Sequence, residues 1–132
     1  MIVADSNLIA SCILESAATA SARSLRDADG EWYVPRLWRY EVANILATMI
    51  KVRGLSAEAA TALFAALSES LRPYEREPVA EAVFALVAKY GISGYDAQFV
   101  ALAQELHCHL YTQDKELLEK FPQLAKPFHG ER

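Results

Sequence analysis

Four carboxylates occupy positions where metal chemistry competes with ordinary structure: Asp5, Glu41, Asp96 and Asp114. Asp5 closes the β-branched run "MIVAD", and Asp114 closes "CHLYTQD". Because the carboxyl ends of parallel strands lie at one edge of a sheet, these two acids are predicted to share that edge. Hard divalent cations prefer oxygen ligands, so carboxylates gathered in one pocket suit one or two such ions.

Glu41 stands on the apolar face of a predicted helix over residues 36–54, beside Leu37, Trp38, Asn44 and Ile45. A carboxylate that faces inward must be paired, protonated or bound to a metal. Asn44, one turn further along, is expected to orient it. The alternative is an ion pair between Glu41 and a nearby arginine, Arg36 or Arg39.

The three aspartates have local alternatives. Asp5 and Asp114 each precede a predicted helix and are suited to cap it. Asp96 follows Ser93 by three residues in "SGYDAQFVALA", which resembles a capping box at the start of an apolar helix. Helix capping is enough to explain any one of these aspartates by itself. Two acids at strand ends and a third facing inward along a helix together favour a shared site.

The elements that position these acids alternate along the chain. Strands are predicted at 1–5, 31–35 and 108–114, with further possible strands at 72–76 and 125–130. Helices are predicted at 6–16, 16–30, 36–54, 56–71, 78–91, 93–107 and 115–121. Strands separated by helices predict a parallel α/β sheet with helices on both faces. We expect one domain over residues 1–132, with no repeat or linker.

Bulk composition narrows the function. The chain has 132 residues, 53% of them hydrophobic, which suffices for a core and for an oligomer interface. A net charge of −4 argues against a protein that coats nucleic acid by bulk charge. There is no secretory signal or membrane-length apolar run, and the two cysteines, Cys12 and Cys108, form no disulfide framework. The default is a reduced, cytoplasmic protein.

Four sequence blocks, in order, resemble the PIN-domain family, and within it the VapC-type ribonuclease toxins of toxin–antitoxin pairs. "IVADSNLIA" resembles the opening strand with its first acid, Asp5, and "VPRLWRYEVANIL" the block with Glu41. "GISGYDAQFVALAQEL" is similar to the block that carries the third acid, Asp96, and "LYTQDKEL" to the one that carries Asp114. The resemblance covers nearly the whole chain.

The resemblance implies a PIN-like three-layer α/β/α sandwich with a short, mostly parallel, five-stranded sheet. It implies metal-dependent cleavage of RNA by an acidic pocket that holds Mg²⁺ or Mn²⁺, with a small antitoxin protein as partner. Asp5, Asp96 and Asp114 are then the expected metal ligands, and Glu41 binds through water or orients the nucleophile. The residues expected to hydrogen-bond this set are Ser6, Asn44 and Thr112. We also expect a homodimer and no membrane association.

Substrate phosphates need local positive charge, and the candidates, each of which has solvated helix surface as its alternative, are Arg36, Arg39, Lys51, Arg53 and Lys115. Tyr40 and Trp38 are candidates for stacking on bases, although the core is the better position for Trp38. "HCH" at 107–109 suggests zinc, but on a strand the two histidines would stand without a second ligand cluster.

Two other functions compete with the nuclease. The first is a PIN-like domain that binds RNA or protein without cutting it. The second is a phosphotransfer domain that uses Asp5 as an aspartyl nucleophile. Haloacid-dehalogenase-like sequences place a second acid two residues later, where this chain has Asn7.

Overall fold

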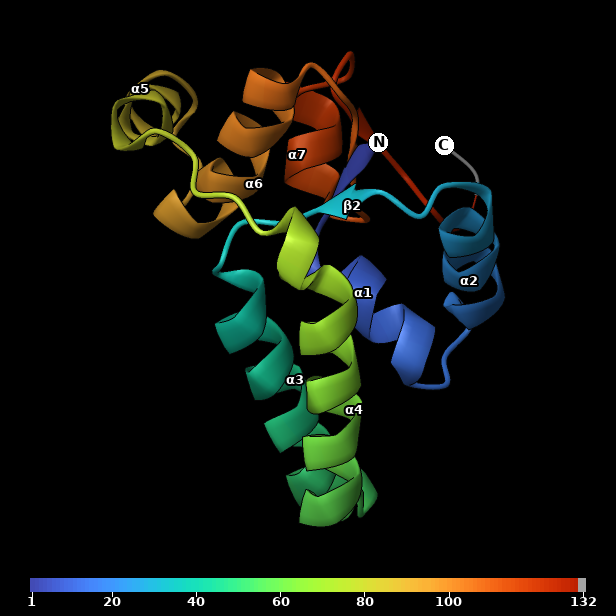
Figure 1. Ribbon diagram of the computed structural model, residues 1–132. Helices are drawn as coiled ribbons and strands as arrows, with labels where there is room; N and C mark the ends of the chain where they lie inside the picture. Colours follow the sequence, from blue (N-terminus) through green and yellow to red (C-terminus); the bar gives the residue numbers. More distant parts are fainter. Residues whose placement is uncertain (131–132) are drawn as a thin grey trace.

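A computed structural model describes residues 1–130, in which four short strands form one sheet (Figure 1). The strands are β1 (Ile2–Ala4), β2 (Trp32–Tyr33), β3 (Leu110–Tyr111) and β4 (Ala125–Lys126). Their order is β2-β1-β3-β4, and all three pairings are parallel. Parallel neighbours need crossover connections, which the helices supply. The predicted α/β class with a parallel sheet is confirmed.

We expected five strands, but the sheet has four within the described residues. The segment 72–76 folds as a 3₁₀ turn, η1 (Arg72–Tyr74), and Glu75 then makes an isolated bridge to Val34. Pro73 has no N–H to donate and a fixed φ, which suits the turn and prevents a ladder. Pro127 likewise follows the last paired residue of β4, which ends at Lys126.

Seven α-helices pack around the sheet in residues 1–130. They are α1 (Ser6–Ile13), α2 (Thr19–Ala28), α3 (Trp38–Arg53), α4 (Ala57–Leu71), α5 (Ala80–Tyr90), α6 (Gly94–Leu106) and α7 (Lys115–Lys120). Gly54 and Gly91 end α3 and α5 with φ of 73° and 68°, a conformation that glycine adopts without strain. His107 ends α6 with φ 54°, so "HCH" does not form the strand that we expected. No helix in the described chain is long and apolar enough to cross a membrane.

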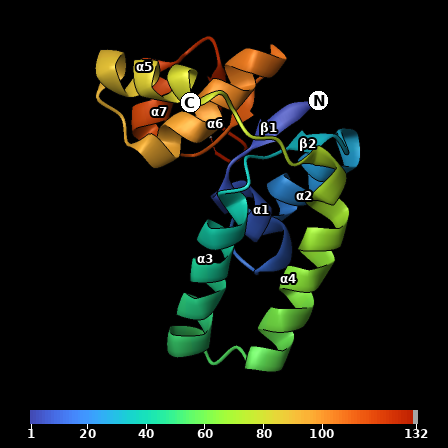
Figure 2. The ribbon, with the colours of Figure 1, turned by 60° about the vertical axis from the view of Figure 1, so that its left-hand side comes forward.

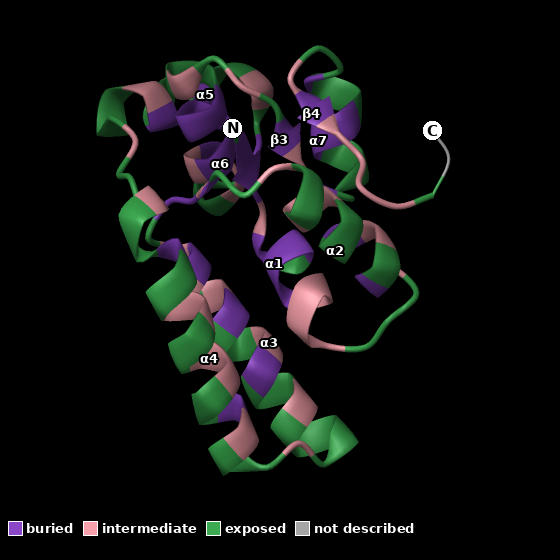
Figure 3. Ribbon diagram, turned by 45° about the vertical axis from the view of Figure 1, so that its right-hand side comes forward, coloured by how far each residue is buried: buried purple, intermediate pink, exposed green. Residues whose placement is uncertain are grey.

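The sheet separates two layers of helices. Val3 of β1 packs in a core cluster with residues of α5, α6 and α7, whereas its neighbours Ile2 and Ala4 pack with residues of α1 to α4. Side chains alternate between the faces of a strand, which explains this division. The three-layer α/β/α arrangement is therefore confirmed. Figure 3 shows buried residues where the helices meet the sheet, and mainly exposed or intermediate residues along the outer part of α3 and α4.

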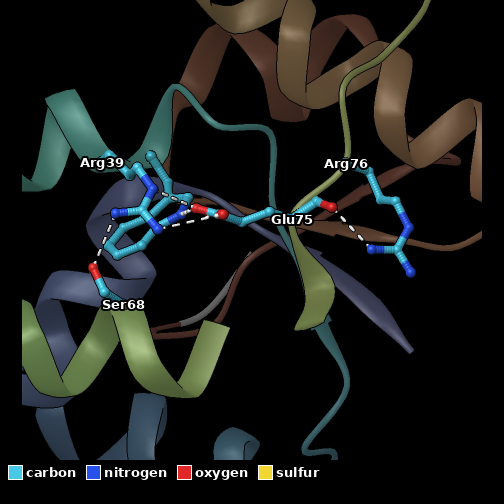
Figure 4. Close-up of polar contacts among 5 residues, drawn as sticks. Arg39, Ser68, Glu75 and Arg76 are labelled. Atoms are coloured by element: carbon cyan, nitrogen blue, oxygen red, sulfur yellow. Dashed lines mark hydrogen bonds and ion pairs between the residues drawn. The ribbon is translucent and has the colours of Figure 1, made fainter. Parts of the chain in front are cut away.

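Helices α3 and α4 form a hairpin that projects from the rest of the molecule (Figures 1 and 2). Glu75 anchors its inner end (Figure 4). The Glu75 carboxylate accepts hydrogen bonds from Trp38 Nε1 and from Arg39 Nε, each at 2.7 Å, and Arg39 Nη1 donates to Ser68 Oγ at 3.1 Å. Trp38 is fully buried and stacks on Phe64, which confirms its expected core position. The first turn of α3 is thus fixed to α4 and to the sheet edge.

Candidate active site

Asp5 follows β1 directly and is held on both carboxylate oxygens. The register pairs Ala4 with Tyr111, and Asp5 N–H donates to the Tyr111 carbonyl at 3.3 Å. Asp5 Oδ1 accepts the Leu8 N–H at 2.9 Å, which confirms the predicted cap of α1. Asp5 Oδ2 accepts the hydroxyl of Thr112 at 2.5 Å. The orientation of this carboxylate is therefore set by two donors.

Asp114 lies at the same sheet edge, as predicted. Its Oδ1 accepts the Leu117 N–H at 2.9 Å and caps α7, and its own N–H donates to Thr112 Oγ1 at 3.1 Å. The fully buried Thr112 hydroxyl therefore links Asp5 to Asp114, donating to one and accepting from the other. Strand β3 ends at Tyr111, so the predicted strand over 108–114 is too long at both ends.

Glu41 extends toward α1, where its partner is Ser6. The buried Ser6 hydroxyl donates to Glu41 Oε1 at 2.7 Å, a contact between residues 35 positions apart. The proposed pairing with an arginine is wrong within the described residues: Arg39 pairs with Glu75 instead, and Arg36 forms no ion pair. A hydroxyl donor holds Glu41 without neutralising its charge.

Asp96 stands in the first turn of α6 and is half-buried. Its N–H donates to Ser93 Oγ at 3.0 Å, which confirms Ser93 as the cap of this helix. Burial raises the pKa of Asp96, and the charges of Asp114 and Glu41 raise it further. These like charges show that the fold brings the acids together.

A cavity of about 440 Å³ collects the four acids. Its lining is Asp5, Ser6, Asn7, Leu37, Tyr40, Glu41, Asn44, Ile45, Tyr95, Asp96, Phe99, Asp114 and Leu117. Among the described residues, no lysine, arginine or histidine lines it, so the five cations expected to receive phosphates lie elsewhere. The expected role of Asn44 is also wrong in one respect: it lines the cavity but makes no hydrogen bond to Glu41.

Burial dominates the electrostatics of Asp5. Burial raises the pKa of Asp5 to about 6, and the Glu41 charge adds to the rise. The hydrogen bonds from Thr112 and from the Leu8 N–H oppose the shift, because they stabilise the carboxylate, but burial outweighs them. A cation in the cavity would remove this penalty.

The donors fit a hard, hydrated cation better than a soft one. Every polar side chain of the lining offers oxygen, and none offers sulfur or imidazole nitrogen. No three His, Cys, Asp or Glu residues in the described chain converge closely enough to hold an ion by themselves. Mg²⁺ commonly keeps several waters and takes only one or two carboxylates directly. The site therefore suits Mg²⁺ or Mn²⁺ in a water-rich shell, and does not suit a zinc cage.

Two features of the lining were missed from the sequence. Tyr95 was not recognised as a cavity residue, although it immediately precedes Asp96 on the solvent side of the same turn. The contact of Ser6 with Glu41 was also missed, because Ser6 was expected only to support the set in general. No periodic pattern connects Ser6 and Glu41, which lie 35 positions apart. Tyr95 could have been found from the sequence, because it directly precedes Asp96.

The fold and the cavity define an α/β domain with an acidic site at the carboxyl edge of a parallel sheet. The chain belongs to the PIN-domain family, whose model matches residues 3–121 and so includes all four acids. It is 32% identical to Ribonuclease VapC3 of Pyrobaculum aerophilum over 129 residues, which cover 96% of this chain and 98% of that protein. The family named from the sequence blocks is confirmed.

Solved structures confirm the fold. PAE2754 from Pyrobaculum aerophilum superposes with a TM-score of 0.76 at 21% identity, over 96% of this chain and 90% of that one. A toxin–antitoxin complex from Klebsiella pneumoniae gives a TM-score of 0.73 at 16% identity, over 98% of each chain. At these identities the comparisons establish a shared architecture.

Proposed function

We propose that the protein is a ribonuclease that depends on Mg²⁺ or Mn²⁺. The observation that carries this proposal is the cavity with four carboxylates and no described cationic side chain. Such a cavity repels an RNA phosphate unless a divalent cation reverses its field. The 32% identity to a protein named as a ribonuclease supports RNA as the polymer that is cut.

The roles we assign to the four acids follow from their hydrogen bonds. A bound Mg²⁺ would neutralise phosphate charge and lower the pKa of a water for in-line attack. Asp5 and Asp96 would be the direct ligands and Asp114 would complete the set, with waters in the positions that the carboxylates do not reach. Thr112 holds the Asp5 carboxylate in place, since it donates to Oδ2. Ser6 occupies Glu41 Oε1, which leaves the second oxygen of Glu41 to orient the attacking water.

The direct test measures cleavage of an unstructured RNA by the purified chain. We expect cleavage with Mg²⁺ or Mn²⁺, none in chelator, and recovery when the metal is added back. Asp96→Asn is expected to weaken Mg²⁺ binding in calorimetric titration with only a modest change in stability. Cleavage that persists in chelator would contradict metal dependence, and an unaltered Mg²⁺ affinity would remove Asp96 from the ligand set.

The same experiment addresses the two alternatives. Metal-dependent binding of RNA without any cleavage would indicate a PIN-like domain that only binds. An acid-labile phosphate on Asp5 would indicate phosphotransfer. The residue two positions after Asp5 is Asn7 and not a second acid, which favours a metal ligand over an aspartyl nucleophile.

We also infer that the partner is a small antitoxin protein that docks on the hairpin. A groove of about 360 Å³ runs between α3 and α4, lined by Ala43, Leu46, Ala47, Ile50, Ala60, Thr61, Phe64 and Ala65. This lining is almost entirely apolar and suits the apolar face of a short helix. A chain with the same fold forms a toxin–antitoxin complex in Klebsiella pneumoniae, which supports the partner class.

The partner inference is tested with the product of the neighbouring reading frame. Ala47→Glu places a charge in the groove and should prevent copurification, while the free chain keeps its nuclease activity. Lys51→Glu, which adds an acid on an exposed position of the same helix outside the groove, is the matched control. Equal binding of the two variants would exclude the groove as the docking site.

A homodimer in the reducing cytoplasm completes the proposal. The high hydrophobic content supports an interface, as do exposed apolar side chains such as Val52 and Val79. Cys12 and Cys108 are free, and burial raises the pKa of both thiols, which suits stable reduced cysteines. Light scattering should give twice the chain mass of 14.6 kDa. A monomer mass at working concentration would contradict the dimer.

A further inference from the structure

We infer that Gln113 is a positioning residue, which holds the proposed metal ligand Asp114 in place through a segment outside the cavity. This segment is residues 127–130, which follow β4 and which we call the strap. The inference rests on the proposed nuclease function and deepens it by adding a residue on which the metal site depends. Gln113 does not line the cavity, so it acts through its neighbours in the chain.

The side chain of Gln113 binds the backbone of the strap three times. Its Oε1 accepts the N–H groups of Phe128 at 2.6 Å and of His129 at 3.0 Å, and its Nε2 donates to the His129 carbonyl at 2.7 Å. Strand β4 ends at Lys126, whose carbonyl accepts the Thr112 N–H at 2.9 Å. The Gln113 amide thus continues the contact between the two segments beyond Lys126. Water alone can satisfy an exposed glutamine, so three bonds to one segment indicate a structural link.

Gln113 lies between two residues that contribute to the site. Thr112 donates to Asp5, and Asp114 lines the cavity. In the described chain, the hydrogen bonds of Asp114 itself go to residues no more than four positions away. They fix the turn 112–114 internally, but they do not place it relative to Asp5. The Gln113 side chain supplies a link from this turn to a distant segment. A shift of Gln113 would therefore move the Thr112 hydroxyl and the Asp114 carboxylate together.

The strap is itself anchored to the layer of α1 to α4. Phe128 packs against the core cluster of that layer, and His129 Nδ1 lies 3.2 Å from Ser21 Oγ on α2. Pro127 has a fixed φ, which limits the freedom of the backbone between β4 and these contacts. Figure 3 shows the chain after β4 at intermediate burial. The strap is therefore held firmly enough to position the turn that Gln113 binds.

The first test measures the affinity for Mg²⁺ by calorimetric titration. Methionine matches the length of glutamine but has no amide, so Gln113→Met removes all three hydrogen bonds. We expect it to weaken Mg²⁺ binding by roughly 3- to 10-fold, less than the loss of a group that bonds a ligand directly, because Gln113 acts through the backbone. Gln123→Met is the matched control, since Gln123 is an exposed glutamine outside the turn and the strap. It should leave the affinity unchanged.

Hydrogen exchange of backbone amides in chelator gives a readout that needs neither metal nor RNA. In Gln113→Met the amides of Phe128 and His129 lose their acceptor and should exchange faster. The Asp114 amide, which donates to Thr112 Oγ1, should also exchange faster, by roughly 2- to 10-fold, because the turn is no longer held. If Gln113 only secured the strap, the exchange of Asp114 would not change.

Phe128→Ala tests the link from its other end. It removes the packing of the strap on the core without altering the turn, so it should weaken Mg²⁺ binding in the same direction. The losses should not add in the double variant with Gln113→Met, because either change disconnects the turn from the core. At limiting Mg²⁺ each variant should lower kcat and leave KM for RNA within about twofold, and excess Mg²⁺ should restore the rate.

The outcomes separate this inference from the nuclease function. Unchanged Mg²⁺ affinity in Gln113→Met would overturn the positioning role, as would faster exchange confined to Phe128 and His129. Fully additive losses in the double variant would overturn the role of the strap. A wild-type chain that binds Mg²⁺ but cleaves no RNA would overturn the nuclease. Faster exchange at Asp114 and weaker Mg²⁺ binding in Gln113→Met would still support the positioning role in that case.

Discussion

At the scale of single residues, Asp5 caps α1, but its ionised carboxylate is destabilised by burial. Its oxygens accept the Leu8 N–H and the Thr112 hydroxyl, which stabilises the ionised form. Burial and the Glu41 charge oppose ionisation more strongly, and the pKa of Asp5 rises to about 6. A cap alone would lower the pKa. The raised pKa means that ionised Asp5 lowers the stability of the free fold, and the proposed cation would relieve this cost.

Asp5→Asn should stabilise the metal-free protein and abolish cleavage. Asparagine caps a helix about as well as aspartate but carries no charge to desolvate. A pKa near 6, against 3.8 in the unfolded chain, corresponds to at most about 3 kcal/mol at pH 7. Urea denaturation in chelator measures the gain. Asp27→Asn, at an exposed position of α2, should change neither stability nor activity. Lower stability with retained cleavage would make Asp5 a cap only.

The raised pKa of Asp5 sets the direction in which stability changes with pH. The folded state holds the Asp5 proton more tightly than the unfolded state, so the contribution of Asp5 is fully present below about pH 4. It is lost as the pH rises through about 6. In chelator, the wild type should lose stability relative to Asp5→Asn across this window. A constant difference between the two across pH 4–7 would contradict the raised pKa.

Thr112→Val should move the acidic limb of the pH–activity profile to higher pH. The Thr112 hydroxyl donates to Asp5, and its removal raises the pKa of that carboxyl further, so the ligand ionises later. The change also leaves the Asp114 N–H unpartnered, at a stability cost of about 1–3 kcal/mol. Thr112→Ser keeps the hydroxyl and should restore the profile. An unshifted limb in the valine variant would show that Thr112 does not tune Asp5.

At the scale of elements, Glu75 fixes the first turn of α3 by hydrogen bonds, as Thr112 fixes the Asp5 carboxylate. Burial opposes its ionisation, but the hydrogen bonds from Arg39 and Trp38 together hold the pKa of Glu75 below its usual value. Both donors lie in the first turn of α3, and Glu41 follows in the same turn. Glu75 thus connects the sheet edge to the helix that carries a candidate catalytic acid. It is a positioning residue that touches no substrate.

Glu75→Gln should lower kcat more than it changes KM. Glutamine removes the charge that pairs with Arg39, so the first turn of α3 loosens and Glu41 loses its fixed position. The expected cost in stability is about 1–3 kcal/mol, lost from the wild type as pH falls below about 4.5. Glu69→Gln is the control, since its pair with Arg72 is long and exposed. Equal kinetics of the two variants would exclude positioning by Glu75.

The sequence predicted the helices well because their signals are local. Ser56 and Ser93 cap the helices that they were expected to start, and Gly54 and Gly91 end theirs. Strands of two or three residues are too short to show the two-residue alternation of side chains that would mark their ends. The predicted strands are therefore longer than the observed ones. The segment 72–76 is only a possible strand from its sequence; Pro73 turns it, and only Glu75 pairs, in a bridge to Val34.

The same distinction applies to the site. All four acids could be found, because strand ends and helix starts are local features and Glu41 interrupts an apolar stripe. Their partners could not be found in the same way. Ser6 orients Glu41, and Glu75 binds Arg39, across sequence distances of 35 and 36 residues. Helical spacing predicts Asn44 as the residue that orients Glu41, because it lies one turn away. The hydrogen bond to Glu41 comes instead from Ser6, on another helix.

At the scale of the whole molecule, the cavity depends on both helical layers. Asp5 caps α1 and Glu41 lies on α3, in the layer of α1 to α4, whereas Asp96 lies on α6 and Asp114 caps α7, in the layer of α5 to α7. Strand β1 contributes side chains to both core clusters. The site is complete only when both layers pack on the sheet. We therefore propose that the chain unfolds as a single domain.

Thermal unfolding should accordingly show one transition by every probe. Trp32 and Trp38 both lie in the cluster of α1 to α4, so tryptophan fluorescence reports that layer, and far-ultraviolet circular dichroism reports all helices. The two midpoints should coincide in chelator. Mg²⁺ should add RT ln(1 + [Mg²⁺]/Kd) to the free energy of unfolding and so raise both midpoints equally, because its ligands come from both layers. Asp96→Asn should reduce the shift for both probes. A shift confined to one probe would show that the layers unfold separately and that the metal binds only one of them.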